Sequence, residues 1–391
     1  MKKIKILAIT GIRSEYDILY PVIKKMNDDE RFEVVIAVSS AHLSDWHNFT
    51  VDKIENDGFK IVDKLDSLFM TSRNVQRAKG IGILTYALSQ TVEREKPDFL
   101  FVIGDREESI ATAIIGNYTN TLTIHLGGGD PVYGNADDPI RMAVSKLAHI
   151  HFTTTKEYAN NLINNLHEDE FRVFFSGNPA LSNVQNVEYI SKEQISNFLK
   201  FDISTKKYIV LIKHPLSSEE NSSYDQMKVT LEALEKFCLK YDFNVIGSFP
   251  NTDPGSYGIL KAIKEYEDKI FINFFSNIPR EYFINIMRNT ELLVGNSSMG
   301  ILEAPSYKIP VVNVGNRQKG RLNAGNVKFV NHKVDEIYSA IEEGCLNENY
   351  RKHVSNLISP YGNGDAPQII CNKILEIKPF DIKWLNKNNL C

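Results

Sequence analysis

The 391-residue sequence predicts an α/β protein made of two doubly wound, Rossmann-like domains with a central cleft. Short apolar runs alternate with longer amphipathic segments along the chain, which is the pattern of βαβ units in a parallel sheet covered by helices on both faces. The length suits two domains of ordinary size. A turn-rich stretch, Ser176–Pro179, separates two such series and is the expected hinge.

The first series precedes this turn. We expect strands at short apolar runs and helices where apolar residues recur three or four positions apart. The expected strands are Ile4–Ile9, Val34–Val38, Phe99–Ile103, Leu122–Leu126 and Ile150–Thr154. The expected helices are Ile18–Asn27, Ile83–Glu95, Glu108–Asn117, Ile140–His149 and Tyr158–Asn165.

The second series follows the turn. Its expected strands are Tyr208–Ile212, Phe243–Ile246, Ile270–Phe274, Leu292–Val294 and Val311–Val314, and its clearest helix is Met227–Tyr241. A loop, Ser359–Asp365, precedes a last helix over Ala366–Ile377. We therefore expect an N-terminal domain over residues 1–177, completed by the C-terminal segment 366–391, and a nucleotide-binding domain over residues 178–365.

The composition argues against several classes of protein. Lys and Arg number 45 against 49 Asp and Glu, so the formal net charge is −4 and no overall field attracts nucleic acid or an anionic membrane. No apolar stretch approaches the ~20 residues that span a bilayer. The four cysteines form neither a CxxC pair nor a zinc knuckle nor a dense disulfide pattern, which indicates reduced thiols in the cytoplasm.

Polar residues follow several of the expected strands in the first domain, and ligands of open α/β sheets bind beyond the carboxyl ends of strands. After the first strand, Arg13 suits a phosphate or a carboxylate, or is an ordinary surface arginine. After Phe99–Ile103, Asp105 lies beside Arg106 and is either an acid–base group or the N-cap of the next helix. No GxGxxG motif follows the first strand, so the dinucleotide fingerprint is absent there.

A glycine-rich segment follows the strand Leu122–Leu126. Three glycines precede Asp130, and such a run makes sense where the backbone approaches a ligand or adopts positive φ. Asp137 lies at the start of the next helix, where the helix dipole favours an acid, so it either caps the helix or faces the ligand. Arg141 lies four residues later, and an ion pair within the helix is its simplest explanation.

The second domain carries the most distinctive motif, the strand end, polar turn and helix start Val294–Pro305. Its turn offers backbone N–H groups, two serine hydroxyls and a positive helix end, which suit a diphosphate. Glu303 follows where a carboxylate suits the two hydroxyls of a ribose. The loop 315–321 adds three cations, Arg317 among them. His214, after the strand Tyr208–Ile212, suits proton transfer or phosphate contact, or has a structural role.

These segments occur together, in this order, in hydrolysing UDP-N-acetylglucosamine 2-epimerases of sialic-acid and legionaminic-acid pathways. The chain resembles that family over nearly its whole length, through GIRSEYDIL, GDREE, HLGGGD, KHP, PNTDPGS, GNSSMGILEAPS, GNRQKGR and SPYGNGDA. The resemblance implies the two-domain GT-B fold and a reaction that needs no metal and no cofactor. UDP would be eliminated from UDP-GlcNAc to leave 2-acetamidoglucal, and hydration would give N-acetylmannosamine for the biosynthesis of sialic-acid-type sugars.

The resemblance also implies roles for individual residues. Proton transfer and handling of the glucal fall on Asp105, Asp137 and His214. Contacts with the substrate fall on Arg13, Arg106, Asn251, Ile278 (through its backbone), Ser297, Ser298, Glu303 and Arg317. Many family members carry a glutamate at the position of Gly127. Here Asp130 is the nearest acid, and it either takes the role of that glutamate or the role is absent.

Three alternatives stand beside this assignment. The same chemistry on a nucleotide-linked 2,4-diacetamido-2,4,6-trideoxy sugar, as in legionaminic-acid relatives, also suits a pocket altered at Gly127. A GT-B glycosyltransferase would use the same nucleotide site with an added acceptor, and a nucleotide-sugar sensor would bind without catalysis. The expected partners are the UDP-sugar substrate and the UDP product, and the resemblance implies a homodimer or homotetramer.

Overall fold

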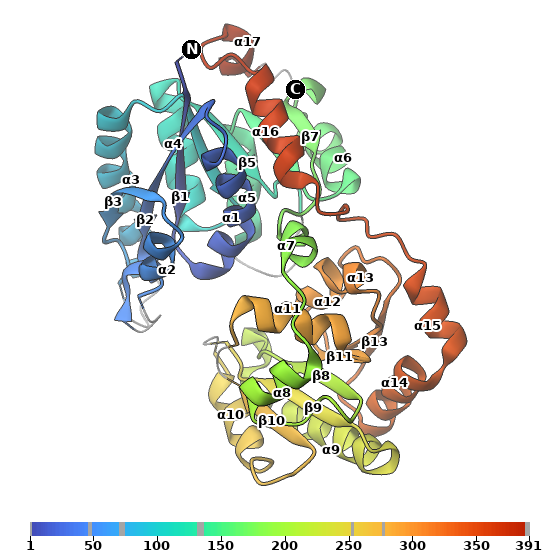
Figure 1. Ribbon diagram of the computed structural model, residues 1–391. Helices are drawn as coiled ribbons and strands as arrows, with labels where there is room; N and C mark the ends of the chain where they lie inside the picture. Colours follow the sequence, from blue (N-terminus) through green and yellow to red (C-terminus); the bar gives the residue numbers. More distant parts are fainter. Residues whose placement is uncertain are drawn as a thin grey trace. The chain divides into compact units, whose positions relative to one another are not determined.

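The computed structural model describes residues 2–45, 49–69, 75–130, 137–251, 254–275 and 278–387 (Figure 1). Contacts between residues divide the chain into two units. Unit 1 consists of Met1–Asn183 together with Tyr361–Cys391, and unit 2 consists of Val184–Pro360. The chain therefore leaves unit 1 and returns to it, and the last segment of the sequence folds with the first.

Unit 1 contains, within its described residues, a seven-stranded parallel sheet in the order β3-β2-β1-β4-β5-β6-β7. The strands are β1 (Ile4–Thr10), β2 (Phe32–Ser39), β3 (Lys60–Leu65), β4 (Phe99–Ile103), β5 (Leu122–Leu126), β6 (Ile150–Thr153) and β7 (Val173–Phe175). The strand order reverses between β1 and β4. Open α/β sheets bind their ligands at such a switch point.

Helices cover both faces of this sheet. They are α1 (Arg13–Asn27), α2 (Val51–Asn56), α3 (Val75–Glu95), α4 (Glu107–Thr119), α5 (Asp137–Leu147), α6 (Lys156–Asn164), α16 (Ala366–Glu376) and α17 (Ile382–Leu385), with short 3-10 turns at Ser40–Leu43 and Glu170–Arg172. The helix α7 (Ala180–Asn186) spans the boundary between the two units in the sequence. Because side chains alternate along a strand, Ile6 and Ala8 of β1 pack with α1 and α16, while Leu7 and Ile9 pack with α3 and α4.

Unit 2 has the same architecture, with a parallel sheet in the order β10-β9-β8-β11-β12-β13. Its strands are β8 (Tyr208–Ile212), β9 (Asn244–Ser248), β10 (Ile272–Phe275), β11 (Leu292–Gly295), β12 (Val311–Val314) and β13 (Val327–Val330). The order reverses between β8 and β11, which places a second switch point there.

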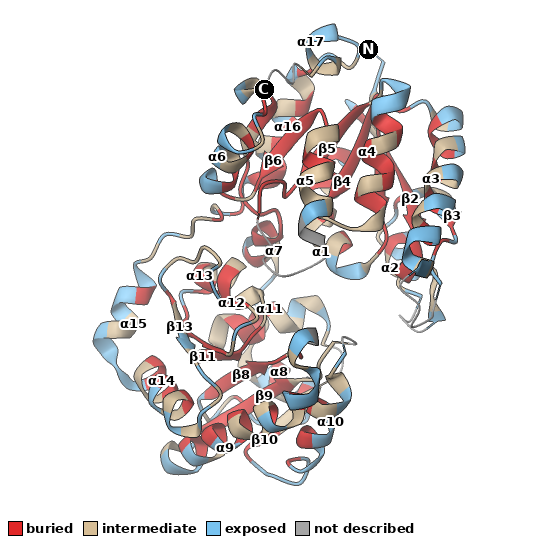
Figure 2. Cartoon of the chain, turned by 180° about the vertical axis from the view of Figure 1, so that it is seen from behind, coloured by how far each residue is buried: buried red, intermediate tan, exposed pale blue. Residues whose placement is uncertain are grey.

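The helices of unit 2 also lie on both faces. They are α8 (Lys192–Leu199), α9 (Ser223–Tyr241), α10 (Ser256–Lys264), α11 (Arg280–Asn289), α12 (Met299–Leu302), α13 (Ala304–Tyr307), α14 (Val334–Leu346) and α15 (Glu348–Ser355), with a 3-10 segment at Ser217–Ser222. Ile209 and Leu211 of β8 pack with α9, α10 and α14, whereas Val210 packs with α8, α11 and α13. Figure 2 shows the buried residues gathered in the strands of each unit.

The central strands were predicted best. The strands β4, β5, β8 and β12 begin and end at the expected residues. The sequence analysis missed β3, β7 and β13, which lie at or near the edges of the two sheets. The edge strand Lys60–Leu65 contains three charged residues and is half exposed along most of its length, so it lacks a continuous apolar run. The strand β7 has only three residues, too few for a clear pattern. In the described part of the chain, no helix is both long and apolar enough to cross a membrane.

Candidate functional site

Loops at the carboxyl edge of the unit 1 sheet bring the predicted acids together. Arg141 of α5 donates from Nε to Asp105 Oδ2 at 3.2 Å, and its Nη2 donates to the same oxygen. Its Nη1 lies 3.3 Å from Asp130 Oδ2 and donates to the Gly127 carbonyl at 3.2 Å. All three charged side chains are at least four-fifths buried. One guanidinium therefore holds Asp105 and Asp130 at a single place.

The structure decides whether Asp105 caps the helix that follows it. Asp105 is not the N-cap of α4, because Arg106 occupies the N-cap position. The described contacts of Arg141 include Asp105 and Asp130, which lie on other loops. Asp137 is the first residue of α5, but its side chain lies outside the described part of the structure, as do residues 131–136. Sequence analysis gave Arg141 no role in the site.

Arg106 lies beside a buried carboxylate that the sequence analysis did not single out. Its Nε is 3.6 Å from Glu108 Oε2, and Glu108 is almost fully buried. Glu108 Oε1 accepts hydrogen bonds from Ser39 Oγ at 3.0 Å and Ser40 Oγ at 2.5 Å. A Cβ at Gly11 would lie only 1.9 Å from Oε1, so glycine there leaves room for the carboxylate. Glu108 thus joins the first turn of α4 to the end of β2 and lies close to Gly11 in the loop after β1.

The start of α1 adds three further charged residues, Arg13, Glu15 and Asp17. Arg13 is the first residue of α1, and its Nε lies 3.6 Å from Asp17 Oδ2. Arg13 is 44% exposed, so it keeps access to solvent. Burial, and then the negative charge of Glu108, raise the pKa of Glu15 well above its ordinary value. The edge of the sheet thus combines arginines with an excess of carboxylates.

In unit 2, one amide side chain joins the ends of two neighbouring strands. Asn296 follows β11; its Oδ1 accepts from the His214 N–H at 2.7 Å, and its Nδ2 donates to the His214 carbonyl at 2.8 Å. The Asn251 N–H in turn donates to His214 Nδ1 at 3.1 Å. The loops after β8, β9 and β11 therefore meet around His214. Sequence analysis quoted Asn296 within a motif but gave it no role.

The turn after β11 has the predicted order of strand, polar turn and helix. Gly295 has a φ of +137°, and a Cβ there would lie 1.9 Å from the Ile212 carbonyl oxygen, so only glycine fits. Ser297 Oγ accepts from the Met299 N–H at 3.3 Å, and Ser298 is the N-cap of α12. The helix is short, since α12 ends at Leu302 and Glu303 separates it from α13.

The basic loop after β12 folds back onto this turn. Arg317 Nη1 and Gln318 Nε2 both donate to the Asn296 carbonyl, each at 3.2 Å. The predicted cation is thus held within the polar cluster of unit 2. Ile278, another predicted contact, packs its side chain against one hydrophobic core of the same unit. Residues 252–253, part of the PNTDPGS motif, lie outside the described residues.

A fully buried lysine underlies His214. Lys213 Nζ donates to the Gln226 carbonyl at 3.0 Å and Thr230 Oγ1 at 2.8 Å, and lies 3.2 Å from His332 Nδ1. Burial lowers the pKa of this lysine to about 7. Its acceptors are neutral, so it forms no close ion pair with them. The KHP motif contained this residue, but only the buried surroundings mark it as unusual.

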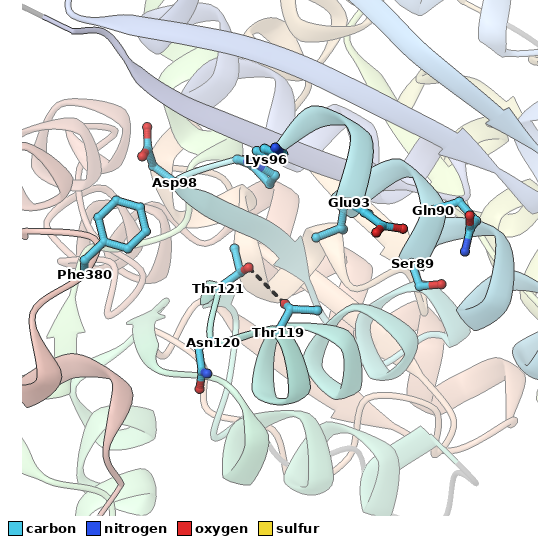
Figure 3. Close-up of a pocket in the computed structure, with 11 residues that line it drawn as sticks. Ser89, Gln90, Glu93, Lys96, Asp98, Thr119, Asn120, Thr121 and Phe380 are labelled. Carbon is cyan, nitrogen blue, oxygen red and sulfur yellow. Dashed lines mark hydrogen bonds between the residues drawn. The ribbon is translucent and has the colours of Figure 1, made fainter.

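A cavity of about 600 Å³ lies in unit 1 on the side where strand β4 begins, opposite the carboxyl ends of the strands (Figure 3). Its lining includes Asp98, directly before β4, Phe380, and Thr119–Thr121 at the end of α4. Asp105 follows the opposite end of β4. Among the described residues, none of the predicted site residues lines this cavity.

Comparison with known proteins assigns the chain to a family. Residues 24–375 match the family model described as UDP-N-acetylglucosamine 2-epimerase. The chain belongs to this family. It is 32% identical over 385 residues to the UDP-N,N'-diacetylbacillosamine 2-epimerase (hydrolyzing) of Legionella pneumophila, which covers 98% of this chain and 99% of that protein. It is 29% identical to the GDP/UDP-N,N'-diacetylbacillosamine 2-epimerase (hydrolyzing) of Campylobacter jejuni, with 88% of each covered.

A solved structure bears on the fold. The structure of UDP-GlcNAc 2-epimerase from Neisseria meningitidis bound to UDP-GlcNAc superposes with a TM-score of 0.80 at 20% identity, covering 96% of this chain and 100% of that one. The predicted α/β fold of two Rossmann-like units of GT-B type is confirmed, as is the predicted family. At 20% identity, this structural similarity supports the fold and nothing beyond it.

Proposed function

We propose that this epimerase-family protein hydrolyses a UDP-linked 2-acetamido sugar with inversion at C2. The first candidate substrate is UDP-N,N'-diacetylbacillosamine, because two similar relatives are named for it. The sequence analysis put UDP-GlcNAc first, and it becomes the second candidate, supported by the description of the family model. Both sugars carry the acetamido group at C2 beside the bond to UDP, so the same chemistry serves both.

The reaction has two balanced stages. A base removes the proton on C2 while the bond between C1 and the phosphate oxygen breaks, so that UDP departs and a C1–C2 double bond forms. Water then adds across that double bond: its hydroxyl bonds to C1, and a proton returns to C2 on the other face. The product is a free sugar with inverted C2. The protein must supply proton transfer at C2 and stabilisation of the departing diphosphate.

Unit 1 is proposed to supply the proton transfer. The observation that carries the proposal is the shared contact of Arg141 with Asp105 and Asp130, which puts two acids at one point of the switch-point edge. We assign proton transfer at C2 to these two carboxylates together with Asp137. In this assignment Asp130 takes the role of the glutamate that many relatives carry at the position of Gly127. Arg106 and Arg13 are assigned to substrate contacts.

Unit 2 is proposed to hold the nucleotide. Ser297, Ser298 and Arg317 are assigned to the diphosphate, and Glu303 to the ribose hydroxyls, with Asn251 and the Ile278 backbone as further contacts. A neutral imidazole that accepts a hydrogen bond at Nδ1 carries its proton on Nε2. His214 Nδ1 accepts such a bond from Asn251, so Nε2 is the atom from which His214 would give a proton.

Incubation with each candidate substrate in D2O tests the proposal. We expect release of UDP together with a free 2-epimeric sugar that carries deuterium at C2, detected by mass spectrometry and NMR. The faster substrate identifies the sugar. An intact UDP-linked epimer as the end product would contradict hydrolysis, and transfer of the sugar to an added acceptor would identify a glycosyltransferase. UDP binding without turnover of either substrate would favour a sensor.

A further inference from the structure

We propose that His125 is a positioning residue of the reaction: a neutral imidazole whose Nε2–H holds the Gly104 carbonyl and thereby sets the place of the Asp105 carboxylate. This inference rests on the proposed role of Asp105 in proton transfer. His125 lies on β5 and is fully buried, so it acts through Asp105 rather than on the substrate.

The contacts of His125 define its tautomer. Its Nε2 lies 2.8 Å from the Gly104 carbonyl oxygen, and its Nδ1 lies 3.2 Å from Ser145 Oγ. A carbonyl oxygen can only accept, so Nε2 must carry the proton. In the neutral ring Nδ1 then accepts from the Ser145 hydroxyl. Both ring nitrogens are thus used, and each hydrogen bond supports the other.

The surroundings keep this ring neutral. Burial, and then the neighbouring His151, lower the pKa of His125 to about 3. The two rings meet edge to face, with centroids 6.3 Å apart. Space for the ring comes partly from Gly128, because a Cβ there would lie 3.0 Å from His125 Nδ1 and 2.9 Å from Ser145 Oγ. His125 is therefore a fixed hydrogen-bond donor at neutral pH and not a proton shuttle.

The held carbonyl belongs to the residue directly before Asp105. Gly104 has a φ of +78°, and its N–H donates to the Leu126 carbonyl at 3.0 Å. The backbone of β5 therefore holds one side of this residue, and His125 holds the other. Without the donor, the Gly104 carbonyl loses its described partner and the backbone entering Asp105 can rotate. A displacement of about 1 Å in a reacting group can cost about a hundredfold in rate.

A matched pair of variants tests this role. His125→Gln and His125→Met are similar in size, but only glutamine keeps an N–H donor for the Gly104 carbonyl. We expect His125→Gln to retain kcat within about fivefold and His125→Met to lower kcat by about 10- to 100-fold. Kd for UDP should stay within about twofold in both, because the contacts proposed for the diphosphate and the ribose lie on unit 2. Equal rates in the two variants would overturn the inference.

Two further measurements keep the test decisive. ¹⁵N NMR of histidine-labelled wild-type protein should show His125 as the neutral Nε2–H tautomer at pH 7, and an Nδ1–H tautomer or an imidazolium would contradict the proposal even if both variants fail to fold. Asp105→Asn separates the two levels of the argument. Wild-type kcat in Asp105→Asn would remove the proposed role of Asp105. A large loss there, with equal rates in the two His125 variants, would remove only the role of His125.

Discussion

The two units share a sheet topology, yet the loops at their switch points are held together by different chemistry. In unit 1 a guanidinium joins two carboxylates, Asp105 and Asp130. In unit 2 the amide of Asn296 joins the backbone of His214 through both of its polar groups. The first arrangement concentrates charged side chains suited to moving a proton. The second fixes the backbone of loops that carry hydroxyls and a cation, which suits the nucleotide binding proposed for this unit. The residues that follow the strands thus give one architecture two different polar clusters.

The units also differ in the number of buried histidines that the structure describes, and the largest expected effect of this difference is a loss of stability at low pH. Burial lowers the pKa of His125 to about 3, against an ordinary value of 6.5. Three further histidines of unit 1 have pKa values lowered by burial to about 4, namely His42, His149 and His151. In unit 2, among the described residues, burial lowers the pKa of His332 to about 4.

A lowered histidine pKa means that the unfolded state binds a proton before the folded state does. The free energy of unfolding therefore falls as the pH drops from about 6.5 toward about 4. We expect unit 1 to lose protection from amide hydrogen exchange before unit 2 in that window. Exchange measured on peptides from each unit, at steps between pH 7 and pH 4, checks this. Earlier loss of protection in unit 2 would contradict the comparison.

Asp105→Asn should give the next largest effect, and it should be confined to catalysis. Removal of the charge should lower kcat by about 10³-fold, within the range of general acid–base catalysis, while Kd for UDP stays within about twofold. Asp98→Asn is the matched control, because Asp98 lies directly before the same strand, β4, and accepts from the Lys5 N–H at the opposite edge. Similar losses of kcat in both variants would indicate a general effect on unit 1 rather than a catalytic role.

Arg317→Ala should have a smaller effect and the opposite character. The loss of a charged contact with the diphosphate should weaken UDP binding by about 30-fold, measured by titration calorimetry. Lys264→Ala removes an exposed positive charge from α10 in the same unit and should leave UDP affinity within about twofold. Unchanged affinity in Arg317→Ala would contradict the proposed role of this loop in nucleotide binding. It would also contradict the proposal that unit 1 transfers protons while unit 2 binds the nucleotide.

Much of the fold could be predicted because its signals are local. A buried central strand must be apolar along its length, so β4, β5, β8 and β12 were found at their observed bounds. The same rule fails at sheet edges, where half-exposed strands such as β13 lack that signal. The candidate site divides in the same way. Glycines and polar residues after strands marked Asp105, His214 and Ser297.

The order of residues along the chain decided which groups follow which strand, because each element and the turn after it form from neighbouring residues. Only the tertiary structure decided which of those groups meet. Arg141 reaches Asp105 across 36 positions, and Asn296 reaches His214 across 82. The physical reason is that a parallel sheet pairs strands that are far apart in the sequence. The residues that hold a switch-point loop therefore come from distant segments, and no local sequence pattern predicts their contacts.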